Sequence, residues 1–123
     1  MSAIAKLSLF AFDCPDPRRL ADFYAGITGW TPTESEGGAW VQLHGDGGVD
    51  LAFQLAPDYQ PPQWPSDERP QQAHIDFDVT DLEAGEAAVI ALGARKAELQ
   101  PSPGSFRVFL DPAGHPFCLV LAD

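Results

Sequence analysis

The feature that most constrains the fold is an approximate internal repeat, in which a strand, a capped helix and further strands occur twice. The stretch FDCPD at 12–16 matches FDVTD at 77–81, at an offset of 65 residues. Near the ends of the two halves, 48–51 aligns with 114–117 at an offset of 66. Each half is too short to bury a stable core of its own, so we predict that the two pack together as one domain.

Each half of the chain predicts the order β-α-β-β-β. Module one covers 6–56, a connector covers 57–72 and module two covers 73–122. The fold class that this order predicts is α+β, with two βαβββ modules in a single domain over 1–123.

Alternating or short apolar runs predict the strands, and helical spacing between an acidic N-cap and a glycine predicts the helices. The first helix follows Asp16 and stops at Gly29, and the second follows Asp81 and stops at Gly93. The expected strands are 7–13, 30–36, 39–45, 49–56, 73–79, 94–99, 105–111 and 116–122. The helix residues expected to face inward are Leu20, Phe23, Tyr24, Ile27, Leu82, Ala88, Val89 and Leu92.

The connector, PDYQPPQWPSDERPQQ, is rich in proline and polar residues, which predicts neither helix nor strand. It is longer than most loops of compact domains, and such loops often carry function. Flanking prolines would hold Trp64 in a defined place. This indole could close over a cleft, or it could pack against a core or dimer surface.

The charge of the chain is strongly acidic, with 18 Asp and Glu against 7 Lys and Arg, a formal net charge of −11. Such a balance disfavours nucleic acid as a partner and would attract a cationic ligand. No apolar run is long enough to span a membrane, and no secretory segment is expected at the start. We therefore expect a cytoplasmic protein that keeps its two cysteines, Cys14 and Cys118, reduced.

Strand alternation predicts which side chains point away from the helices and toward a cleft. In the second module, His74, Asp76 and Asp78 are expected on the cleft side of the strand at 73–79. Cys118 and Val120 are expected on the cleft side of the last strand. In the first module the equivalent set is Asp50, Ala52 and Gln54, with Trp40 on the neighbouring strand. Arg107, one of few cations, could bind an anionic ligand or pair with a surface acid.

Three motifs carry a resemblance to a known family: DP…FY…TGW at 16–30, HIDFDV at 74–79 and DPAGHPFCL at 111–119. The chain resembles the vicinal oxygen chelate superfamily, which includes glyoxalase I, bleomycin-resistance and fosfomycin-resistance proteins and extradiol dioxygenases. More narrowly, it is similar to short glyoxalase-like proteins of unassigned function. The resemblance implies two four-stranded sheets that curl into an open cleft, and a homodimer.

The resemblance also implies a metal site with four ligands, usually His and Glu. Carried onto this chain, those positions hold Leu9, Ala52 (with Gln54 two residues along), His74 and Cys118. Only His74 is a usual ligand, so the implied hard-ion site is largely lost and no metal cofactor is favoured.

Three interpretations of His74 and Cys118 remain open. With Asp76 or Gln54 as a third ligand, they could hold a soft ion such as Zn²⁺. They could form a His–Cys nucleophilic pair. They could also be a polar group and a small apolar residue that line the cleft.

The function predicted from these features is binding of a small, largely apolar molecule, with a cation favoured by the acidic charge, and without the family metal. The alternative is a metal-dependent lyase, isomerase or dioxygenase of the glyoxalase type that retains His74 as a ligand. The residues expected to contact the ligand are His74, Cys118, Gln54, Asp76, Trp40, Trp64, Arg107, Leu9 and Ala52.

Overall fold

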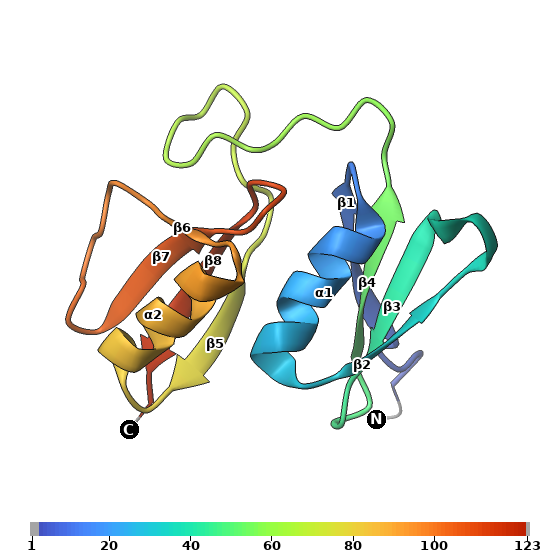
Figure 1. The fold of residues 1–123 in the computed structure, drawn as a ribbon, viewed down its shortest axis with the longest axis horizontal. Helices are drawn as coiled ribbons and strands as arrows, with labels where there is room; N and C mark the ends of the chain where they lie inside the picture. The colour runs from blue at the N-terminus through green and yellow to red at the C-terminus, as the bar shows by residue number, and fades with distance from the viewer. Residues whose placement is uncertain (1–2, 123) are drawn as a thin grey trace. The chain divides into compact units, whose positions relative to one another are not determined.

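The computed structural model describes residues 3–122 and divides the chain into two compact units. Unit 1 is Met1–Tyr59 and unit 2 is Gln60–Asp123. Each unit contains one α-helix and one four-stranded sheet (Figure 1). Within residues 3–122, no helix combines the length and the apolar character needed to cross a membrane.

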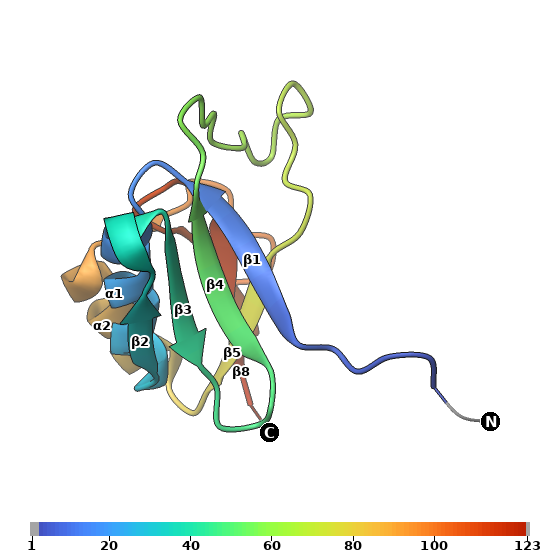
Figure 2. The same cartoon turned by 90° about the vertical axis from the view of Figure 1, so that its right-hand side faces the viewer.

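Unit 1 builds its sheet in the order β1-β4-β3-β2, with β1 parallel to β4 and the other pairs antiparallel (Figure 2). The helix α1 follows β1 and a short 3-10 helix, η1, follows β2. The elements are β1 Leu9–Cys14, α1 Pro17–Thr28, β2 Thr31–Glu34, η1 Glu36–Gly38, β3 Trp40–His44 and β4 Asp50–Leu55.

Unit 2 repeats this topology in the order β5-β8-β7-β6, again with its first and last strands parallel. Its elements are β5 Ile75–Val79, α2 Leu82–Leu92, β6 Arg95–Lys96, β7 Phe106–Leu110 and β8 Pro116–Leu121. The predicted fold class, α+β with two βαβββ modules and open sheets, is confirmed.

The strand register agrees with the repeat that the sequence predicts. In unit 1 Ala11 pairs with Ala52, and in unit 2 Asp76 pairs with Cys118. An offset of 65 carries Ala11 onto Asp76, and an offset of 66 carries Ala52 onto Cys118. The paired first and last strands of the two units therefore present equivalent positions, which differ in the side chains that they carry.

Both helices begin and end as their capping residues predict. The Asp16 carboxylate accepts a hydrogen bond from the Arg19 amide at 3.2 Å, and the Asp81 carboxylate accepts one from the Ala84 amide at 3.0 Å. Gly29 and Gly93 end the helices with φ of 76° and 118°, a left-handed conformation that glycine adopts without steric cost.

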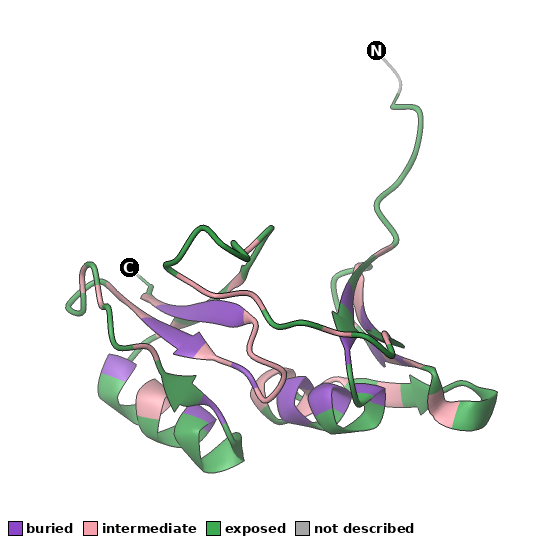
Figure 3. Cartoon of the chain, turned by 90° about the horizontal axis from the view of Figure 1, so that it is seen from above, coloured by how far each residue is buried: buried purple, intermediate pink, exposed green. Residues whose placement is uncertain are grey.

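The helix α1 covers its sheet with large side chains. Leu20, Phe23 and Tyr24 are buried, and the Tyr24 ring stacks on Phe53 with centroids 5.5 Å apart. The buried positions of Figure 3 include this face of α1 and the strands beneath it. Burial of large apolar and aromatic surface is the main stabilising contribution in this unit.

The helix α2 is seated differently, and the prediction that Ala88 and Leu92 face inward is wrong, since both are exposed. Buried contact runs through Leu82 and Val89, with Gly85 between them. A Cβ atom at Gly85 would lie 3.1 Å from Leu119 Cδ1. The missing side chain thus lets the helix approach the sheet closely, along a narrower stripe than the apolar pattern predicts.

Two predicted strands are shorter in the structure. The strand predicted at 30–36 ends at Glu34, because the chain then turns through η1, where Gly37 has a φ of 83°. The strand predicted at 94–99 shrinks to Arg95–Lys96. Beyond it, the Gln100 side-chain amide bonds both the amide and the carbonyl of Val108, at 2.9 and 2.8 Å, and so takes the place of a neighbouring backbone.

The connector 57–72 contains neither helix nor strand, as predicted. Its unit 2 part folds back on itself, since the backbone N–H of Gln63 donates a hydrogen bond to the backbone carbonyl of Arg69 at 2.6 Å. The Arg69 guanidinium in turn donates to the Pro61 carbonyl at 3.2 Å. These bonds close a small loop that carries Trp64.

Candidate functional site

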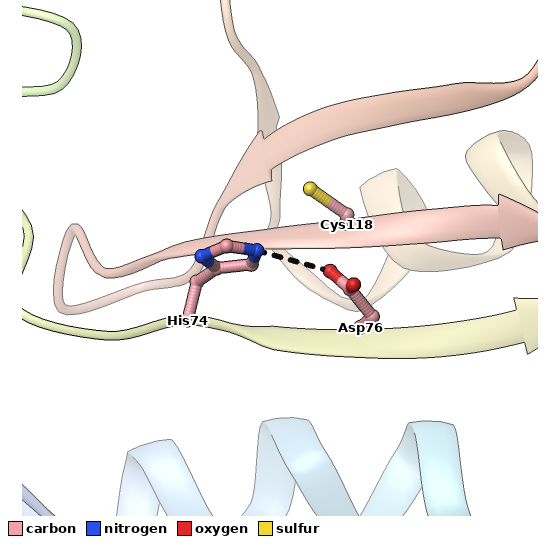
Figure 4. Close-up of side chains that lie close together, drawn as sticks. All are labelled: His74, Asp76 and Cys118. Atoms are coloured by element: carbon pink, nitrogen blue, oxygen red, sulfur yellow. Dashed lines mark ion pairs between the residues drawn. The ribbon is translucent and has the colours of Figure 1, made fainter.

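The candidate site is a group of three side chains on the sheet of unit 2, namely His74, Asp76 and Cys118. Asp76 and Cys118 are directly paired residues of the parallel strands β5 and β8, and His74 lies just before β5 (Figure 4). Side chains two residues apart on an extended chain point to the same face, so His74 joins the pair. One ligand atom from each residue lies within 4.8 Å of the others.

The three side chains lie close enough to influence one another. His74 Nε2 lies 3.2 Å from Asp76 Oδ1, and both side chains are partly exposed. The Cys118 thiol is buried, and its sulfur lies within 4.8 Å of the ligand atoms of both. The group therefore has one buried member and two that solvent or a ligand can reach.

The environment of Cys118 makes its thiol a poor nucleophile. Burial, together with the negative charge of Asp76 and the hydrogen bond to that carboxylate, raises the pKa of Cys118 to about 11. Because the thiolate is the reactive form, the thiol is almost entirely unreactive at neutral pH. This weighs against the hypothesis of a His–Cys nucleophilic pair.

A cavity of about 390 Å³ lies over this face of the unit 2 sheet. Its polar residues are His74, Asp76, Cys118 and Gln71, and the remaining wall is apolar. The apolar wall is formed by Trp64, Pro101, Phe106, Val108, Pro116 and Val120. A mostly apolar cavity of this size with a few convergent polar groups is the usual form of a small-molecule site.

Four of the predicted ligand contacts, His74, Asp76, Cys118 and Trp64, line this one cavity. Val120, which strand alternation also directed toward the cleft, is part of the wall, whereas sequence reasoning missed Gln71, Pro101, Phe106, Val108 and Pro116. Val108 could have been found, since it pairs with Cys118 across the antiparallel strands β7 and β8 and shares its face. Gln71 and Pro101 come from loops, where no periodic pattern indicates direction.

The other predicted contacts in module one lie on the sheet of unit 1. Leu9 and Gln54 lie on β1 and β4, with Gln54 exposed, and Ala52 is fully buried. The Trp40 indole donates to Gln42 Oε1 at 3.1 Å, and Gln42 in turn donates to Asp50 at 2.7 Å. The side chains of Trp40, Gln42 and Asp50 therefore form a chain of hydrogen bonds along the sheet.

Arg107 does not line the cavity. It lies on β7 opposite Leu119, a residue that packs beneath α2, and its guanidinium pairs with Glu83 at 2.8 Å and Glu86 at 3.2 Å. The hydrogen bond and charge of Arg107 lower the pKa of Glu83, and the same pairing raises the pKa of Arg107. Of the two roles predicted for Arg107, the structure shows the pairing with surface acids.

Comparison with known proteins identifies the family. A family model described as the glyoxalase-like domain matches residues 9–120. The chain belongs to the glyoxalase-like domain family. No curated protein matches this glyoxalase-like chain.

Solved structures with the same fold come from the wider vicinal oxygen chelate superfamily. The fosfomycin resistance protein FosX from Mesorhizobium loti has 20% identity and a TM-score of 0.68, over 98% of this chain and 94% of that one. A glyoxalase/bleomycin resistance protein/dioxygenase family enzyme from Burkholderia phytofirmans PsJN has 20% identity and a TM-score of 0.68, over 94% and 97%. A glyoxalase-related enzyme from Fulvimarina pelagi has 16% identity and a TM-score of 0.69, over 97% and 89%. At these identities the likeness extends to the fold alone.

The residues of this glyoxalase-like chain do not fit the hard-ion site that the superfamily resemblance implies. Leu9 and Ala52 have hydrocarbon side chains with no atom that could bind a metal, and Ala52 is fully buried. At the position of the expected acid, Cys118 offers sulfur, which prefers softer ions than oxygen ligands do. His74 is the one implied position that holds a usual ligand.

Proposed function

We propose that this glyoxalase-like protein binds a small, largely apolar molecule in the cavity of unit 2, with a cationic or hydrogen-bond-donating group held at its polar end. The observation that carries the proposal is the cavity of about 390 Å³, which is lined mostly by apolar side chains and also by the Asp76 carboxylate. An apolar ligand would gain by removing that wall from water.

Two groups at the polar end favour a ligand that donates hydrogen bonds. Asp76 is an acceptor that is partly exposed to the cavity. Gln71 Oε1 is buried and has no hydrogen-bond partner within residues 3–122. A buried acceptor without a partner is costly, so a donor on the ligand would gain from satisfying it. The acidic net charge of −11 adds long-range attraction for a cation.

Trp64 supports the proposal from the connector side. Its indole lines the cavity on a segment closed by the bonds between 61 and 69. Trp64 and the Asp76 carboxylate line the same cavity, and an aromatic ring together with a carboxylate suits an organic ammonium ion, which can contact a ring face while it pairs with an acid.

The test is a matched series of ligands added to the metal-free protein in the presence of a chelator. Benzyl- and alkylammonium ions are compared with neutral and carboxylate analogues of the same shape, by melting temperature and by isothermal titration. We expect the ammonium members to raise the melting temperature most. Asp76→Asn should weaken their binding by about tenfold, the value of one charge-assisted contact at a partly exposed site.

The matched control is Asp78→Asn, which makes the same charge change two residues along β5 without altering the cavity wall. It should leave the affinity unchanged. The proposal fails if no member of the series stabilises the protein, or if Asp78→Asn weakens binding as much as Asp76→Asn does. Homodimer formation, which the family resemblance implies, is a separate prediction that sedimentation of the same samples measures.

A further inference from the structure

We infer that His74, Asp76 and Cys118 form a binding site for one soft divalent cation of the zinc type, built within unit 2 alone. The site keeps two of the positions that the superfamily resemblance implies, His74 and Cys118, but its third ligand, Asp76, lies outside that set and replaces the two positions in unit 1. The inference goes beyond the proposed function, since it holds whether or not an organic ligand binds.

The spacing of the three ligand atoms is close to what a tetrahedral ion requires. Typical zinc–sulfur, zinc–nitrogen and zinc–oxygen bonds place neighbouring ligand atoms about 3.3–3.6 Å apart. His74 Nε2 and Asp76 Oδ1 are already 3.2 Å apart. The largest separation within the group is at most 4.8 Å, so we expect a small side-chain adjustment to bring the third atom into range when an ion binds.

The strands hold these side chains in place. Asp76 and Cys118 are paired residues of β5 and β8, so their side chains leave the sheet side by side. Figure 4 shows the imidazole, the carboxylate and the thiol converging above these two strands. A site on paired strands costs little conformational entropy when an ion binds, because the backbone is already ordered.

The chemistry of this set selects the class of ion. A thiolate and an imidazole favour zinc and similar ions over magnesium, calcium or manganese, which prefer oxygen ligands. The implied hard-ion positions at Leu9 and Ala52 supply no ligand atom. At the position of the expected acid, Cys118 supplies sulfur, and together with His74 and Asp76 it makes a set suited to a soft ion.

Three protein ligands leave one coordination position of a tetrahedral ion open. All three residues line the cavity, so a small molecule bound there would lie close to the ion. Water or a donor atom of a small molecule would complete the coordination. Since Asp76 also holds the cationic group in the proposed function, the ion and an ammonium ligand should exclude each other.

The test is a titration of the reduced, metal-free chain with Co²⁺, which substitutes for zinc and is visible by absorption. We expect one equivalent to give tetrahedral d–d bands and a thiolate-to-cobalt charge-transfer band, both abolished by added Zn²⁺. Cys118→Ser should remove the charge-transfer band. Asp76→Asn, at a partly exposed residue whose change should not impair folding, should weaken cobalt binding by at least about tenfold.

Cys14→Ser is the matched thiol control, because Cys14 is the other cysteine of the chain and lies buried in unit 1. It should leave the cobalt spectrum unchanged, as should Asp78→Asn. The inference is overturned if no charge-transfer band forms, if the band survives Cys118→Ser, or if it is lost in Cys14→Ser.

The outcome is separable from that of the proposed function. Ammonium binding in chelator with no cobalt spectrum would overturn the ion site and leave the proposed function intact. A cobalt spectrum with no ammonium binding would overturn the proposed function and leave the ion site intact. If both bind, benzylammonium should lower the apparent affinity for Zn²⁺, and unchanged zinc affinity would contradict the shared role of Asp76.

Discussion

Units 1 and 2 have the same topology and strand register, yet the two sheets carry different chemistry on the face away from the helix. Where unit 1 pairs Ala11 with Ala52, unit 2 pairs Asp76 with Cys118. The backbone repeat is thus common to both units, while a few side chains decide which of them could hold a ligand.

The polar side chains of the two units also differ in their partners. In unit 1 the carboxylate of Asp50 accepts from Gln42 at 2.7 Å and from the Gly45 amide at 2.8 Å, and lies 3.3 Å from His44. In unit 2 the polar group lies beside a cavity. Polar groups that satisfy one another strengthen the structure, whereas polar groups that border a cavity remain available to a ligand.

The largest expected effect is on the free energy of unfolding and concerns the packing of each helix against its sheet. The repeat makes Leu20 in α1 and Gly85 in α2 equivalent positions. Leu20→Ala should lower the free energy of unfolding by about 2–5 kcal/mol, since a buried leucine leaves a cavity. Gly85→Leu should lower it by about 1–3 kcal/mol through overpacking against Leu119. Urea denaturation followed by circular dichroism measures both changes.

Gly29→Ala is not a suitable control for Gly85→Leu, because Gly29 has a left-handed φ at which alanine would add strain of its own. Ala88→Leu is the matched control, since Ala88 lies on the exposed side of α2 and should accept the larger side chain. A stable Gly85→Leu variant would contradict the close approach of α2 to its sheet.

A smaller effect is expected from acid, and it should depend on unit 1. The hydrogen bonds from Gln42 and Gly45 lower the pKa of Asp50 below its ordinary value of 3.8. A lowered pKa in the folded state means that the stabilisation is present above the unfolded pKa and is lost as the pH falls through the folded one. Asp50→Asn should therefore be less stable at neutral pH and should lose less stability below about pH 4.

Thermal unfolding across pH 2–7, a range that brackets ordinary carboxyl pKa values of about 4, measures this dependence. The control is Asp46→Asn, an exposed residue in the turn of the same hairpin. Identical pH profiles for Asp50→Asn and the unmodified chain would show that the hydrogen bonds of Asp50 do not stabilise the carboxylate.

The smallest effect is expected at Arg107. Arg107→Met keeps the aliphatic length but removes the ion pairs with Glu83 and Glu86, and partly exposed pairs of this kind contribute little. The melting temperature should fall only slightly, and ammonium affinity should not change, since Arg107 is absent from the cavity wall. A clear change in affinity would restore the role as a ligand contact that the sequence predicted for Arg107.

Much of the fold could be predicted because it depends on local rules. Capping by Asp16 and Asp81 fixed where the helices begin, and the glycines after them fixed where they end. The inward face of α2 was mispredicted because glycine does not contribute to an apolar periodicity, although Gly85 faces the sheet. Its importance depends on how closely a helix approaches a sheet, which is a property of packing.

The sequence by itself determined that His74 and Asp76 share a face, because strand alternation is a property of the extended backbone. Only the tertiary structure decided that Cys118 stands directly beside Asp76, and that loop residues such as Gln71 and Pro101 close a cavity over them. Strand pairing and loop placement join residues far apart in the chain, and they depend on the packing of a whole unit. For that reason the polar group could be suspected from the sequence, but its cavity could not.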